Sequence, residues 1–147
     1  MGIIFTLDQM KEHIQYPAFV QEYFNHHATI YKVSVIGTYI HCDKKASTKD
    51  FKLEDNPEPV FFNSQNMKDI TDQETYKTQP DLSEDDCMHV AKSLSLTLGL
   101  HMYGFDVIRC NKSGKLVVID VNFFPSFRAV PDVNNKIMDL FDTLTQK

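Results

Sequence analysis

The strongest constraint on the fold is a pair of apolar segments near the carboxyl end, separated by a short polar turn. Residues 104–110 and 116–121 are rich in β-branched and aromatic side chains, and residues 111–115 read NKSGK. Two runs of this composition that flank a turn containing glycine indicate an antiparallel β-hairpin. We therefore expect the last third of the chain to be organised around this hairpin.

Two aspartates occupy matching positions on the two expected strands. Asp106 lies seven residues before Ser113, the centre of the turn, and Asp120 lies seven residues after it. In a regular hairpin the two aspartates face each other, and Asn122, two residues further on, shares their side of the sheet. Because the flanking residues are apolar, we expect both strands to be buried, so that the paired carboxylates repel each other and lose hydration. Mg²⁺ would relieve both costs, since carboxylate and amide oxygens are its preferred ligands. The alternative is a shifted register that turns one aspartate towards solvent.

Lysines provide the second chemical signal. Lys32 lies inside an apolar segment, residues 29–36, that we expect to be a strand. A buried lysine needs an anionic partner, which can be a phosphate or a carboxylate, whereas an edge-strand lysine serves only to prevent aggregation. Residues 44–59 are polar and are expected to form a loop, whose lysines are either solvated or a local anion site. These lysines are Lys44, Lys45, Lys49 and Lys52.

The composition excludes several classes of protein. The chain has 147 residues, 42% hydrophobic and 24% charged, which is typical of one globular domain. A net charge of -5 disfavours binding to duplex nucleic acid. The three cysteines have no disulfide-framework spacing, so we expect a reducing, cytoplasmic location. No segment approaches the roughly 20 apolar residues of a membrane-spanning helix.

Periodicity and turn residues predict an α+β domain with a mostly antiparallel sheet and packed helices. Helices are expected after the caps Thr6 and Ser83, the second ending at Gly99, and over residues 133–145. Further strands are expected at residues 3–5, 18–24, 29–36, 39–43 and 60–62, and residues 63–80 are expected to be irregular. His26 and His27 lie in an expected turn and are interpreted as surface residues.

Five motifs occur in a recognisable order: QEYFNH at residues 21–26, YKV at 31–33, FFNS at 61–64, GFD at 104–106 and IDVNFFP at 119–125. In these motifs the chain resembles the inositol 1,3,4-trisphosphate 5/6-kinases, also called inositol-tetrakisphosphate 1-kinases, over nearly its whole length. The resemblance implies the carboxy-terminal part of an ATP-grasp fold. It also implies transfer of the γ-phosphate of ATP to a hydroxyl of an inositol polyphosphate, with two Mg²⁺ ions.

The resemblance assigns a role to each matching position, with residues 21–24 as a hinge strand beside the adenine. It implies ATP contacts for Gln21, Glu22, Tyr23, Lys32, Ser47 and Ser64. It implies metal binding by Asp106, Asp120 and Asn122, and inositol phosphate binding by Lys32, Asn122 and Ser126. Lys32 and Asp120 would be the catalytic residues.

The chain also departs from the family pattern. Ser126 stands where glycine is usual, Lys45 where arginine is common, and Phe123 is bulkier than the usual residue. Met1 falls midway through the family's ATP-grasp region. We therefore expect residues 1–147 to be a partial ATP-grasp domain, without the amino-terminal inositol-binding domain and the first part of the ATP-grasp, and to self-associate through the exposed cleft face. The alternatives to an active kinase are an inactive remnant that binds a nucleotide or a protein, and a different ATP-grasp ligase.

Overall fold

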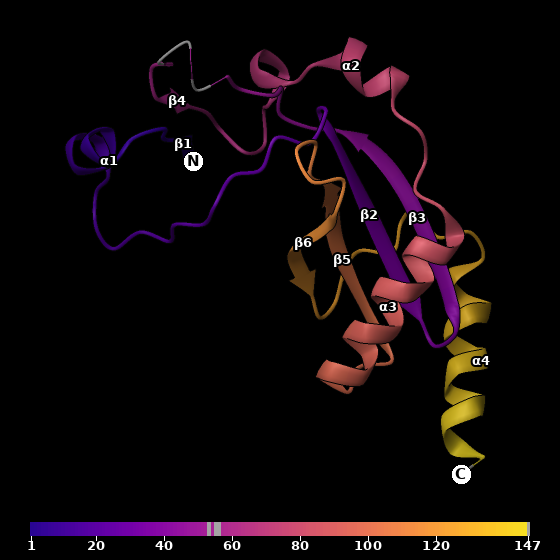
Figure 1. The fold of residues 1–147 in the computed structure, drawn as a ribbon. Coiled ribbons are helices and arrows are strands. Elements are labelled where there is room, and N and C mark those ends of the chain that lie inside the picture. The colour runs from indigo at the N-terminus through magenta and orange to yellow at the C-terminus, as the bar shows by residue number, and fades with distance from the viewer. Residues whose placement is uncertain (53, 55–56, 147) are drawn as a thin grey trace. The chain divides into compact units, whose positions relative to one another are not determined.

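The computed structural model describes residues 1–52, 54 and 57–146, which form both helices and strands (Figure 1). The order of elements is β1 (Gly2–Ile3), α1 (Leu7–His13), β2 (Thr29–Ile36), β3 (Tyr39–Ala46), β4 (Val60–Phe61), the 3₁₀ turn η2 (Lys68–Ile70), α2 (Gln73–Thr78), α3 (Glu84–Leu98), β5 (Met102–Arg109), β6 (Leu116–Asn122) and α4 (Val133–Thr145).

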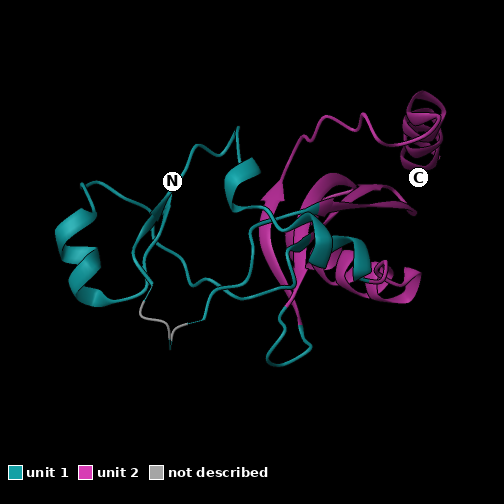
Figure 2. Ribbon diagram, turned by 90° about the horizontal axis from the view of Figure 1, so that it is seen from above, with its two compact units in different colours: residues 1–29, 46–79, 110–115 teal, residues 30–45, 80–109, 116–147 magenta. Residues whose placement is uncertain are grey.

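The chain divides into two compact units, coloured separately in Figure 2. Unit 1 comprises residues 1–29, 46–79 and 110–115. Unit 2 comprises residues 30–45, 80–109 and 116–147, and contains the four-stranded sheet.

The core of unit 2 lies between this sheet and α3. The strand order is β3-β2-β5-β6, and β5 runs antiparallel to both of its neighbours. Alternate residues of β2 and β5 are buried and pair across the strands, with Val33 opposite Phe105 and Val35 opposite Tyr103. Cys87 and Ala91 of α3 belong to the same apolar cluster, so α3 covers this face of the sheet, as Figure 1 shows.

Local signals set the position of α3. The Ser83 hydroxyl accepts a hydrogen bond from the Asp86 amide, 3.1 Å away, which caps the first turn. Gly99 ends the helix in the left-handed region at a φ of 66°. The buried Tyr103 hydroxyl donates to the Ala91 carbonyl at 2.7 Å, so its polar atom is satisfied inside the core.

A smaller apolar cluster covers one end of the opposite face of the sheet. It contains Ile36 of β2, Phe127 and Val130 of the segment after β6, and Leu140 of α4. The middle of that face carries polar side chains, among them Lys32, Ser34 and Asp106. The sheet therefore has one apolar face and one face whose middle is polar.

Unit 1 is built largely from hydrogen-bonded loops. Thr6 caps α1 by accepting from the Gln9 amide at 3.2 Å, as predicted. The Asp50 carboxylate accepts from the backbone amides of His26 and His27 at 2.8 and 3.0 Å, and from the Asn111 side chain at 2.7 Å. These charge-assisted bonds hold the turn before β2, where His27 and Ala28 have positive φ angles.

Several expectations from the sequence are wrong. Residues 18–24 form no strand: Phe19 is 89% exposed, and no neighbouring strand pairs with the segment among the described residues. Residues 63–80 are not wholly irregular, because Asp72 caps α2 by accepting from the Thr75 amide at 3.0 Å. β3 extends to Ala46, into the segment expected to be a loop.

His26 is buried rather than on the surface, with 5% of its area exposed. Both of its ring nitrogens have hydrogen-bond partners. No helix in the described part of the chain combines the length and the apolar character needed to cross a bilayer.

Candidate functional site

On the polar face of the sheet, the predicted site residues that belong to strands of unit 2 lie in two rows across three strands. In the first row Lys32 of β2 lies opposite Asp106 of β5, which lies opposite Asp120 of β6. In the second row Ser34 lies opposite Gly104, which lies opposite Asn122. Side chains two residues apart on a strand share a face, so both rows point to the same side.

The predicted pairing of Asp106 with Asp120 is confirmed, but a regular hairpin does not produce it. Val107 pairs with Val118, so the register changes between Asp106 and Val107 and Ile119 is the extra residue of a β-bulge. Continuing the register near the turn would place Ile119 opposite Asp106 and turn Asp120 to the other face. The bulge thus decides that the two aspartates share a face, and no feature of the sequence analysis had indicated it.

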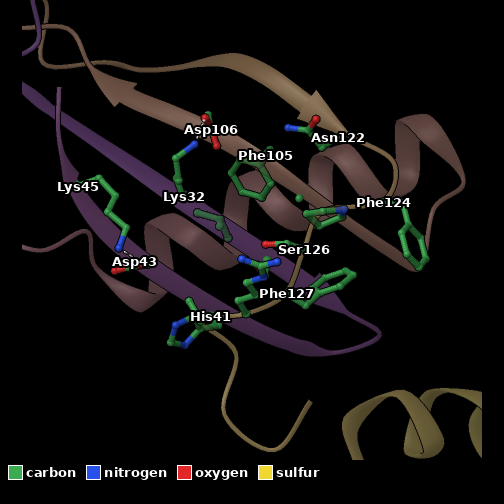
Figure 3. Close-up of a pocket in the computed structure, with 16 residues that line it drawn as sticks. Lys32, His41, Asp43, Lys45, Phe105, Asp106, Asn122, Phe124, Ser126 and Phe127 are labelled. Atoms are coloured by element: carbon green, nitrogen blue, oxygen red, sulfur yellow. Dashed lines mark hydrogen bonds and ion pairs between the residues drawn. The ribbon is translucent and has the colours of Figure 1, made fainter. Parts of the chain in front are cut away.

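Each aspartate of the first row is engaged by a neighbouring donor. The Lys32 ammonium lies 2.5 Å from an Asp106 carboxylate oxygen, and the Asn122 side-chain amide donates to Asp120 at 2.6 Å. The Lys32 ammonium and the Asn122 amide thus stabilise the two carboxylates, as a bound cation would otherwise do. Lys32, Asp106 and Asn122 also line a pocket of about 550 Å³, shown in Figure 3.

The pocket carries further polar groups that the sequence analysis did not assign to the site. Three come from β3 and one from the segment after β6: His41, Asp43, Lys45 and Arg128. Ser126, which was predicted to bind the substrate, lines the same pocket. Lys45 pairs with Asp43 at 2.6 Å, as Figure 3 shows. The alternation of β3 could have suggested this set, because residues 41, 43 and 45 share one face of that strand. Lys45, which we had treated as part of a loop, is therefore a strand residue of the site face.

The segment after β6 approaches the sheet closely at Gly104. A β-carbon built at Gly104 would lie 2.9 Å from Cγ and 3.0 Å from Cβ of Pro125, closer than side chains normally approach. Only glycine therefore lets Pro125 rest against β5 at this point. Phe127 is buried two residues later, so residues 125–127 are held against the sheet at both ends and form one wall of the pocket.

Two expectations about burial need correction. The side chain of Lys32 is 51% exposed, so it is not a buried lysine, and it is not on an edge, because β2 lies between β3 and β5. Asp120 and Asn122 are exposed, because β6 is an edge strand and only partly buried. The desolvation argument for a cation is therefore weak here, whereas the argument from two facing carboxylates stands.

The predicted ATP contacts other than Lys32 belong to unit 1. Gln21, Glu22 and Ser64 are exposed. The Tyr23 hydroxyl donates to the Lys49 carbonyl at 3.0 Å and lies 2.7 Å from the Thr48 hydroxyl, and burial raises the pKa of Tyr23 to about 12. The Tyr23 side chain therefore fixes the predicted hinge segment to residues 48–49 by hydrogen bonds, without a strand.

Ser47 is hydrogen bonded to a buried histidine. Its hydroxyl lies 2.9 Å from Nε2 of His26, whose Nδ1 lies 2.7 Å from the Phe24 carbonyl. Because a carbonyl can only accept, Nδ1 carries the proton, and Nε2 of the neutral ring accepts from Ser47. Burial lowers the pKa of His26, which agrees with a neutral ring.

The oxygen atoms of the first and second rows fit a divalent cation. No group of three histidine, cysteine or acidic side chains suited to a metal occurs among the described residues, so the candidate set is two carboxylates and one amide. Mg²⁺ accepts such a small set of protein oxygens, because it retains water ligands and takes others from phosphates. Asp106, Asp120 and Asn122 would hold the ion.

The chain matches one protein family along almost its whole length. The model of the inositol 1,3,4-trisphosphate 5/6-kinase ATP-grasp domain matches residues 1–143. An inositol-tetrakisphosphate 1-kinase of Xenopus laevis is 30% identical over 155 residues, covering all of this chain and 39% of that protein. Inositol-tetrakisphosphate 1-kinase 1 of Arabidopsis thaliana is 27% identical over 164 residues, covering all of this chain and 50% of that protein.

The antiparallel sheet with its packed helices is therefore an α+β part of an ATP-grasp domain. More narrowly, the chain belongs to the inositol 1,3,4-trisphosphate 5/6-kinase family, as its motifs had indicated. It spans half or less of the length of the relatives described above.

Proposed function

We propose that this chain carries the Mg²⁺ and phosphate-transfer part of an ATP-dependent inositol polyphosphate kinase. The observation that carries the proposal is the row of Lys32, Asp106 and Asp120 across three neighbouring strands, with Asn122 bonded to Asp120. A lysine and two facing carboxylates match the charges of a nucleotide phosphate chain and its metal ions. Family membership supports the reaction class.

Each residue of the row has a distinct part in the proposed site. Asp106, Asp120 and Asn122 would hold Mg²⁺, which when bound neutralises charge on the phosphates. Lys32 leaves Asp106 and binds an oxygen of the transferred phosphoryl group, and its half-exposed side chain has room to turn. Ser126 contacts the inositol phosphate. Catalysis comes from positioning and charge neutralisation.

Family membership also supports the ATP contacts that were predicted for residues of unit 1. Gln21, Glu22 and Tyr23 contact the adenine side, and Ser47 and Ser64 contact the rest of ATP. The Tyr23 hydroxyl is already bonded to residues 48–49, so the backbone of the hinge segment offers the more available hydrogen-bonding groups.

The replacement Asp120→Asn tests the metal assignment. It removes one negative charge with little change in shape, so we expect the Mg²⁺-dependent part of ATP binding to weaken roughly 10- to 100-fold, the range seen when groups that support a metal are altered. Isothermal calorimetry with Mg-ATP and with ATP in EDTA measures that part. Asp85→Asn, an exposed carboxylate in the first turn of α3, is the matched control. Equal Mg-ATP affinity of Asp120→Asn and the unaltered chain would refute the assignment.

An inactive remnant is the second candidate, and Ser126 is the observation that favours it. This side chain lines the pocket where the family usually has glycine, so it occupies space beside the expected substrate phosphate. A remnant binds Mg-ATP without phosphorylating any inositol polyphosphate, and Ser126→Gly then restores turnover if the hydroxymethyl group is the obstacle. Turnover by the unaltered chain would eliminate this candidate.

A further inference from the structure

The pocket contains one cationic side chain, Arg128, that has no role in the proposed function. Three cationic side chains line the pocket: Lys32, Lys45 and Arg128. Lys32 and Lys45 form ion pairs with Asp106 and Asp43. No carboxylate of the described residues forms an ion pair with Arg128. Its charge is thus available to an anion that enters the pocket.

The backbone on both sides of Arg128 is anchored. Phe127 and Val130 are buried in the same apolar cluster as Ile36 and Leu140, and the Val130 amide donates to the Phe127 carbonyl at 3.0 Å. Phe127 adopts a φ of 48°, which is uncommon for a bulky residue and persists only where packing enforces it. Arg128 is therefore presented from a fixed turn, which reduces the conformational entropy lost when it binds a ligand.

The rows of the sheet show which end of the pocket Arg128 lines. The aspartates lie in the first row and Gly104 in the second, and Ile36 pairs with Met102 in a third row. Successive rows are roughly 7 Å apart. Pro125 rests on Gly104 and Phe127 packs with Ile36, so the segment runs away from the aspartates before it reaches Arg128. The backbone of Arg128 therefore stands at the end of the pocket remote from the proposed metal site.

We propose that Arg128 is a specificity residue that binds a phosphate group of the acceptor, and not a phosphate of ATP. This inference depends on the proposed function, in which the nucleotide phosphates lie at the row of Asp106 and Asp120. The acceptor hydroxyl must approach the transferred phosphate from the remaining part of the pocket, and the acceptor's own phosphates then face the remote end. A guanidinium binds phosphate through two parallel hydrogen bonds, so Arg128 selects acceptors that carry a phosphate at the matching ring position.

Separate binding measurements on the full chain test this inference. Calorimetry is performed once with an inositol tetrakisphosphate alone and once with Mg-ATP alone, on the unaltered chain, Arg128→Gln and Arg128→Lys. We expect Arg128→Gln to weaken inositol tetrakisphosphate binding about 10- to 100-fold, as for the loss of hydrogen bonds to a charged group, and to leave Mg-ATP binding unchanged. Arg128→Lys should lie between the two, because it keeps the charge and loses the paired geometry. Lys92→Gln, on the exposed side of α3, is the matched control for removal of one positive charge.

Two results would overturn the role of Arg128: equal inositol tetrakisphosphate affinity in Arg128→Gln and the unaltered chain, or a loss confined to Mg-ATP binding. A failure of the proposed function looks different. In that case the inositol tetrakisphosphate binds with the expected dependence on Arg128, but no phosphate is transferred from Mg-ATP. Far-ultraviolet circular dichroism of each variant verifies that the fold is retained.

Discussion

At the scale of single residues, His26 shows how a polar side chain can stabilise a loop from inside. Its ring is buried and bridges the Phe24 carbonyl and the Ser47 hydroxyl, which are more than twenty residues apart in the sequence. The pKa of His26 is lowered from its ordinary value of 6.5, chiefly by burial. The folded chain therefore takes up a proton at His26 less readily than the unfolded chain does.

This arrangement predicts that the folded chain loses stability in mild acid. As the pH falls through 6.5, the unfolded chain takes up a proton on His26 before the folded chain does, so the free energy of unfolding decreases until the pH is below the folded pKa. In His26→Asn the amide can still donate to Phe24, and this contribution to the pH dependence disappears. At neutral pH we expect this variant to be about 1 kcal/mol less stable, because the bond to Ser47 is lost. Urea unfolding between pH 5 and pH 8 measures both effects, and parallel pH profiles for the two proteins would contradict the prediction.

At the scale of elements, two local irregularities produce the site face. The bulge at Ile119 brings Asp120 onto the face of Asp106, and Gly104 allows residues 125–127 to close one wall of the pocket. Bulges of this kind are common beside functional sites, because they redirect one side chain without disturbing the rest of the sheet. Regular strands alone would have formed the same core without the same pocket.

The contact at Gly104 predicts the effect of a single methyl group. In Gly104→Ala the new β-carbon meets the rigid ring of Pro125, so either the wall of the pocket or the strand must move. We expect a loss of about 1–3 kcal/mol in the free energy of unfolding and weaker binding of an inositol tetrakisphosphate.

Two further variants identify the cause of any such loss. Gly114→Ala, in the open turn, meets no atom within 4 Å and pays only for its φ of +69°. Pro125→Ala removes the nearer ring atom and should recover part of the loss when combined with Gly104→Ala. If the losses in Gly104→Ala and Pro125→Ala are simply additive, Pro125 is not the obstructing residue.

At the scale of the whole molecule, large apolar side chains remain exposed next to an open sheet edge. β6 is an edge strand, and the residues that follow it, Phe123 and Phe124, are 68% and 81% exposed. An unpaired strand edge beside apolar side chains favours association with another chain. The predicted self-association would involve this part of unit 2.

We therefore predict reversible self-association that depends on Phe123. Replacing Phe123 with serine removes the burial of one large apolar side chain, worth about 1.5–3 kcal/mol, and should weaken association roughly 10- to 100-fold. Sedimentation velocity over a range of concentrations measures the effect. Leu96→Ser, which removes an 87% exposed leucine of α3, is the control. A monomer at every concentration, or equal weakening by both replacements, would contradict the prediction.

The sequence alone determined the elements whose signals are local. Ser83 and Gly99 fixed the ends of α3, and alternating apolar residues identified β2 with its observed bounds, because capping and strand periodicity depend on near neighbours. The motifs likewise identified the family and the side chains of the first row. By contrast, only the tertiary structure decided which strands are edges, how far Lys32 is exposed, and whether residues 18–24 find a partner. These properties, like the bulge at Ile119 and the place of Arg128 in the pocket, depend on contacts between residues far apart in the chain, and no local pattern encodes them.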